Sequence, residues 1–170
     1  LAKTLKGNVE QASNVLLRIA HAQIDAKHNK DALITLRHLR PILLKSEFDN
    51  WSDRGSDMAG GFVLAGDNNS AMSLVRSIED IGHRAKAMSE VAHAIGHRGN
   101  IDAAIPLFSL AFKDTQRLAG DEKRFPVIQH MVHRQSKLSR YADAFKMAGH
   151  VRDRQMQALT MLGMGKAMLE

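Results

Sequence analysis

Apolar residues recur along this chain with the spacing of amphipathic helices. Met88, Val91, Ala92 and Ile95 lie three, four and seven positions apart, which places their side chains on one face of a helix. No stretch shows the clean alternation of apolar and polar residues that predicts a strand. Short polar segments rich in Asn, Asp, Ser and Gly follow at intervals, and these residues are typical of helix caps. The pattern predicts an all-α chain of many short helices with tight turns.

The polar segments divide the predicted helices into pairs. We expect these pairs at 9–26 with 30–45, 51–65 with 68–79, 81–97 with 100–116 and 122–137 with 140–149, then a last helix from 152. Pro41 should end or kink the helix that contains it, because a proline ring blocks one backbone hydrogen bond, and Pro106 should kink the helix at 100–116 for the same reason. Pro126 is expected in a first turn, where its missing N–H is harmless. Glycines, Gly60 and Gly61 among them, should leave the helix at 51–65 short or bent.

Small residues mark an internal repeat. Each of four anchor positions is followed twelve positions later by an alanine. The anchors are Ala20, Ala59, Ala92 and Val132, and the alanines are Ala32, Ala71, Ala104 and Ala144. Three of the intervening turns carry Gly66, Gly99 and Ser139. A fixed spacing of this kind predicts that each segment is one structural unit, repeated along the chain.

Arginines extend the repeat toward the C-terminus. Arg84 and Arg124 each precede the next anchor by eight residues, and Arg154 precedes Leu162 by the same interval. This spacing indicates a fifth, incomplete unit. The first residue is not Met and the segment from Met161 still has helical spacing, so we expect the chain to be a fragment of a longer protein.

The repeat resembles the tetratricopeptide-like family of helical repeats, in which a small residue in a first helix, a glycine at the turn and an alanine in a second helix form each unit. Few bulky aromatics stand at the matching positions, and no proline ends each unit. The resemblance implies a right-handed α-solenoid of antiparallel helix pairs, with about four hairpins and a terminal helix, whose first helices line a concave groove. It implies a single helical-repeat domain over 1–170, with units at 9–45, 51–79, 81–116, 122–149 and 152–170.

Composition narrows the function classes. The 170 residues are 44% hydrophobic and 25% charged, which favours a folded chain. The 24 Lys and Arg residues against 18 Asp and Glu give a net charge of +6, which suggests an acidic partner. The absence of cysteine excludes disulfides and thiolate metal sites. No apolar run reaches the roughly 20 residues of a membrane span, and the compartment stays open.

The nine histidines are the most conspicuous chemical feature of the chain. His21, His93 and His133 each follow an anchor residue, and the resemblance places that position on the concave face. The expected partner-binding residues are Asn14, His21, Asp25, Lys86, Ser89, His93, His97, Gln129, His133, Lys137 and Lys166. The alternative is that these are ordinary polar residues of solvated helix faces. If they do form a groove, its histidines should add positive charge as pH falls and strengthen binding to an acidic partner.

Metal and enzyme chemistry have little support in the sequence. His93 with His97, and His130 with His133, have spacings that place two imidazoles on one helix face. No third ligand or His-Glu-x-x-His motif accompanies them, so we expect neither a metal site nor a cofactor. No nucleophile elbow, phosphate loop or dinucleotide fingerprint is present.

We therefore expect a non-catalytic module for protein interaction that holds an acidic peptide or helix of a partner in its groove. One alternative is a basic helical-repeat RNA binder, although few aromatics are available for stacking on bases. Another is a regulatory or scaffolding segment of a larger enzyme. The sequence does not predict an oligomeric state.

Overall fold

A computed structural model describes the backbone of residues 2–44 and 51–169, and the side chains of residues 10–43, 54–166 and 169. These segments contain nine α-helices and no strand, which confirms the all-α prediction. The helices are α1 (Ala2–Asp25), α2 (Asn29–Leu44), α3 (Trp51–Leu64), α4 (Asn68–Arg76), α5 (Ile81–His97), α6 (Ile101–Gln116), α7 (Asp121–Lys137), α8 (Tyr141–Ala148) and α9 (Arg154–Leu169). The expected helix end at residue 45, and residues 1 and 170, lie outside the described residues.

Most helix boundaries fall within two residues of the predicted ones. The exceptions are α1, which begins at Ala2, and α4, which ends at Arg76. Helix α3 is unbroken but short, with 14 residues against 17 in α5 and α7. The prolines lie inside α2, α6 and α7, so Pro41 does not end its helix and Pro126 lies beyond the first turn.

Four turns, each between the two helices of a pair, share one backbone conformation. The residue seven positions after each anchor has a positive φ: 62° at Lys27, 100° at Gly66, 91° at Gly99 and 58° at Ser139. In each turn the next residue donates its backbone N–H to the carbonyl five residues earlier, at 2.8 to 3.2 Å. This is the Schellman arrangement, which satisfies carbonyls left open at a helix end. The chain therefore reverses direction in the same way in every pair.

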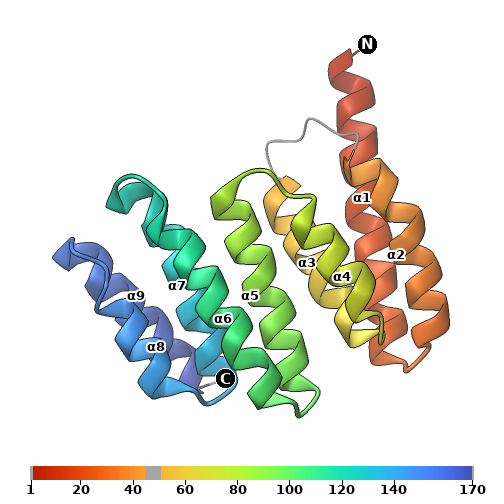
Figure 1. The fold of residues 1–170 in the computed structure, drawn as a ribbon. Helices are drawn as coiled ribbons and strands as arrows, with labels where there is room; N and C mark the ends of the chain where they lie inside the picture. Colours follow the sequence, from red (N-terminus) through yellow and green to blue (C-terminus); the bar gives the residue numbers. More distant parts are fainter. Residues whose placement is uncertain (1, 45–50, 170) are drawn as a thin grey trace.

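The helices pack as two layers. The first helices of the pairs, α1, α3, α5, α7 and α9, contact one another in chain order, and each contacts its own second helix where it has one. Among the described residues the backbones of the second helices, α2, α4, α6 and α8, do not come close to one another, but each second helix contacts the next first helix. Figure 1 shows the pairs side by side, from α1 and α2 at one end to α8 and α9 at the other.

Small residues at the repeat positions lie inside the helix pairs. All four anchors and all four paired alanines are at most 1% exposed. A side chain no larger than alanine lets two helices approach closely, and Phe62, Leu36 and Leu74 fill the space around these contacts. The main core extends from α1 to α7, while a separate, smaller cluster around Ile128 and Val132 joins α7, α8 and α9.

Two of the repeated arginines make equivalent contacts. Arg84 Nη1 donates to the Ile78 carbonyl at 3.2 Å, and Arg124 Nε donates to the Leu118 carbonyl at 2.7 Å. Both carbonyls lie six residues before the arginine and just after the end of a second helix. The cations therefore bind carbonyls at the negative end of the preceding helix and fix how one pair follows the next.

Candidate functional site

The expected partner-binding residues lie on three first helices and on α9, with different exposures. Asn14, Asp25, His97, Lys137 and Lys166 are exposed. His21, Lys86, His93, Gln129 and His133 are partly buried. Ser89 is fully buried and donates its hydroxyl to the Lys86 carbonyl at 2.9 Å. Ser89 is therefore wrong as a partner-contacting residue, because it faces the packing between helices instead of the surface.

Glu90 of α5 is the centre of a polar cluster that joins α5 to α7. Its side chain is 7% exposed, and Oε1 lies 2.5 Å from both Nε and Nη2 of Arg134. His130 Nε2 lies 3.1 Å from the same oxygen, and the two form an ion pair when the imidazole is protonated. Burial acts to raise the pKa of Glu90, but His130 and the positive charge of Arg134 outweigh it and lower the pKa. The carboxylate thus stays ionised and neutralised within the protein.

Asp57 brings α3 into the same cluster. Burial, and next the negative charge of Glu90, raise the pKa of Asp57, while His21, Arg134 and His130 act in the opposite direction. A cluster formed by Asp57, Glu90, His93, His130 and Arg134, here named the Glu90 network, therefore spans three consecutive first helices. It contains two carboxylates whose environments shift their pKa values in opposite directions.

Two adjacent glycines let α3 approach both of its neighbours. A Cβ atom at Gly60 would lie 3.7 Å from the Cβ of Glu90. A Cβ atom at Gly61 would lie 3.6 Å from His21 Nε2 on α1 and 3.5 Å from Leu36. These are ordinary contact distances, so the glycines place α3 directly against the polar residues of α1 and α5.

His93 does not behave as the expected charge switch. Burial and the nearby charge of Arg134 lower its pKa to about 4, although Glu90 acts in the opposite direction. The imidazole therefore stays neutral between pH 7.5 and 5.5, and the predicted gain of positive charge in that range is wrong for this residue.

At the N-terminal end, Arg54 of α3 is held by α1. Its Nε donates to Asn14 Oδ1 at 2.7 Å, and its Nη2 lies 2.6 Å from Glu10 Oε1. Arg54 is only 8% exposed. Asn14, one of the expected partner-binding residues, thus already uses its amide oxygen to hold α3 against α1.

The partner-binding prediction omitted Asp57, Glu90, His130 and Arg134. The first three, together with Arg18, occupy the position two residues before each anchor. Every unit therefore carries a titratable or charged residue there, one helical turn from the position of His21, His93 and His133. Reading two positions of the repeat together, instead of one, would have identified most of the Glu90 network.

Within residues 10–43, 54–166 and 169, no group of three or more His, Asp or Glu side chains is arranged to hold a metal ion. His93 and His97 have ring centroids 6.2 Å apart with planes tilted by 47°. The described helices include none with the length and apolarity needed to cross a membrane.

Comparison with known proteins gives no relative. No family model matches the chain, and neither the curated proteins nor the solved structures contain a match. The resemblance to tetratricopeptide-like repeats therefore depends entirely on the internal pattern of this chain.

Proposed function

We propose that the chain is a right-handed α-solenoid of tetratricopeptide-like helix pairs that serves as a non-catalytic scaffold for protein interaction. In this proposal the face formed by α1, α5 and α7 binds an acidic peptide or helix of a partner protein. The observation that carries it is the spacing of the helices: the backbones of the first helices approach one another in series, whereas those of the second helices do not. Such a pattern is what a layer curved toward its first helices would produce.

The shared turns and arginines support the repeat on which the proposal depends. Four turns have the same positive-φ residue and the same hydrogen bond, and Arg84 and Arg124 bind equivalent carbonyls. Independent local structures rarely agree in so many details. The agreement is expected when one unit is repeated along the chain.

Charge supports an acidic partner at the α5 and α7 part of this face. Glu90 is neutralised by Arg134, so its negative charge is largely cancelled within the protein. Lys86 and Lys137 stand on the same two helices, and Lys137 is exposed. Both cations would attract a negatively charged partner.

The test is a titration of the full chain with fluorescent peptides that match in apolar content but are acidic, neutral or basic. We expect only the acidic peptide to bind, with an affinity that falls as salt increases. The double variant Lys86→Glu with Lys137→Glu should weaken binding by roughly tenfold or more, whereas Lys30→Glu, a matched charge reversal at the start of α2, should not.

Two results would overturn the proposal. One is equal binding of the acidic and basic peptides. The other is preferential binding of a single-stranded RNA oligonucleotide that the Lys86→Glu with Lys137→Glu variant loses, since it would assign the same face to nucleic acid. Circular dichroism of each variant shows whether the helices remain folded.

A further inference from the structure

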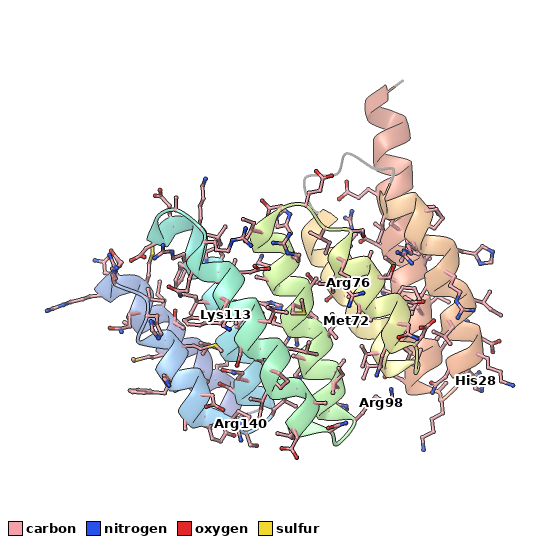
Figure 2. The ribbon with its side chains drawn as sticks, viewed as in Figure 1. His28, Met72, Arg76, Arg98, Lys113 and Arg140 are labelled. Atoms are coloured by element: carbon pink, nitrogen blue, oxygen red, sulfur yellow. The ribbon has the colours of Figure 1, made fainter. Side chains whose placement is uncertain are left out.

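A cleft opens between the second helices α6 and α8, on the side of the molecule opposite to the face formed by α1, α5 and α7. It has a volume of about 300 Å³ and is lined by α6, by the turn that joins α7 to α8, and by α8. Figure 2 labels two of its residues, Lys113 of α6 and Arg140 before α8, on the side that faces the viewer. This volume is at the lower end of the range for ligand pockets and suits one or two large side chains.

The floor of the cleft is apolar. Ala104 and Phe108 are buried beneath it, and Leu138 and Met147 pack against them from the α7 and α8 side. Ile105, at its edge, is 37% exposed. An apolar side chain that entered the cleft would therefore leave water for a surface of aliphatic and aromatic groups.

The rim of the cleft is basic. Lys113 and Lys146 are exposed on α6 and α8, respectively, so they stand on either side of the apolar floor. Arg140 is neutralised locally, because its Nε donates to Asp143 Oδ2 at 2.8 Å. His150 packs against Phe112, with ring centroids 4.8 Å apart and planes tilted by 57°. The two lysines thus leave a positive balance on a rim that surrounds an apolar surface.

One buried polar atom at the cleft lacks a partner. Gln135 lines the cleft and is 4% exposed, and its Oε1 accepts no hydrogen bond from the described residues. A buried acceptor without a donor is unfavourable. A ligand with an N–H group would satisfy it, and a peptide supplies one at nearly every residue.

The furrow between α2 and α4 is different. There Arg37 Nη2 binds Asp67 Oδ2 at 2.9 Å and Arg40 Nη2 donates to Ser73 Oγ at 2.9 Å, so side chains bridge the two second helices. No hydrogen bond or ion pair joins α6 to α8 in the described part of the chain. The α6/α8 cleft is thus less bridged by polar side chains than the furrow between α2 and α4.

We propose that the α6/α8 cleft binds a short acidic peptide segment of a partner protein, with one large apolar side chain as its anchor. The anchor rests on Phe108, Leu138 and Met147, and carboxylates on either side of it pair with Lys113 and Lys146. A backbone N–H of the peptide donates to Gln135. This site lies on other helices than the α1, α5 and α7 face and does not depend on the function proposed for that face.

The experiment selects peptides from a random phage-displayed library on the full chain, then measures their affinity by fluorescence anisotropy. We expect enriched sequences to combine a large apolar residue with flanking Asp or Glu. Ser109→Trp places a bulky ring into the cleft from an exposed position and should abolish binding. Lys113→Glu with Lys146→Glu should weaken it by roughly tenfold or more. Lys86→Glu with Lys137→Glu should leave it unchanged.

Enriched peptides without acidic residues, or binding that survives Ser109→Trp, would overturn the proposal. So would a failure to enrich any sequence. If laurate binds to the cleft and displaces the peptide with much higher affinity, the cleft belongs to a lipid-like acid instead. Circular dichroism and thermal unfolding of Ser109→Trp distinguish a filled cleft from a misfolded chain.

Discussion

Helices α5 and α9 occupy the same place in the predicted repeat but have opposite surroundings. Helix α5 contacts α3, α4, α6 and α7, and of its residues only His97 is exposed. Helix α9 contacts α7 and α8, and its Leu159, Leu162 and Leu169 are 52%, 71% and 90% exposed. The same helical pattern therefore gives a buried helix in one case and a half-covered one in the other.

The difference shows that the helices packed against a residue determine its burial and its pKa more than its position in the predicted repeat does. On α5, partial burial lowers the pKa of His93, and residues of α7 lower the pKa of Glu90. On α9, Gly163 and Gly165 have open space where a side chain would be. The predictions below compare the two helices, from the largest expected effect to the smallest.

The largest effect should come from His93 at low pH. Its pKa is about 4 in the folded protein against an ordinary value of 6.5, so the unfolded chain binds a proton more readily in that interval. The contribution of His93 to the free energy of unfolding is thus complete above pH 6.5. It falls by about 3 kcal/mol as pH decreases toward 4. Urea unfolding across this range should show that His93→Gln loses much less stability than the wild type.

His28→Gln is the matched control for His93→Gln, because His28 is an exposed histidine in the turn before α2. It should keep the pH dependence of the wild type. Glu90, His97, His130 and Arg134 act on His93 and remain in both variants. If the wild type and His93→Gln lose the same free energy of unfolding as pH falls, the buried imidazole is not the cause of the pH dependence.

The next effect concerns Glu90. In Glu90→Gln, Arg134 and His130 lose the carboxylate that they contact. Arg134 is 26% exposed, so the cost lies between that of surface and buried pairs, at about 2 kcal/mol. Thermal unfolding should give a melting temperature lower by roughly 4–8 °C. Glu79→Gln, at an exposed position before α5, should melt like the wild type.

The smallest effect compares two glycines. Gly163→Ala adds a methyl group in open space on α9 and should raise the free energy of unfolding by about 1 kcal/mol. Gly96→Ala on α5 would place a Cβ 2.6 Å from Leu138 Cδ1 and 3.2 Å from Ile101 Cδ1. We expect it to lower stability by about 1 kcal/mol, as overpacking exceeds the gain in helix propensity. Equal effects in denaturant unfolding would remove the contrast between the two helices.

The helices were predictable from sequence because their signals are local. Spacing of apolar residues, cap residues and turn glycines placed most boundaries within two residues. The prolines were harder: α2 runs three residues past Pro41, since a helix tolerates one missing hydrogen bond when packing holds the rest. The positive φ of Lys27 could not be predicted from a glycine, because the residue is lysine. Only its position, seven residues after an anchor like Gly66 and Gly99, relates it to those turns.

The candidate site was less predictable because its properties depend on contacts between distant residues. Ser89 has the spacing of a surface residue but is covered by packing. Arg134 contacts Glu90 across 44 positions of sequence, and this contact changes the charge balance of the whole face. The α6/α8 cleft depends on how far apart two helices stand, and no residue pattern within either helix encodes that separation.

The wider spacing of the second helices has a mechanical consequence. Since the backbones of the first helices approach one another in series, a bend of the chain about these contacts would change the spacing of the second helices most. A slight rotation about the contact between α5 and α7 would widen or narrow the separation of α6 and α8 with little rearrangement inside. A ligand bound between α6 and α8 would thus limit how far α5 and α7 can rotate against each other.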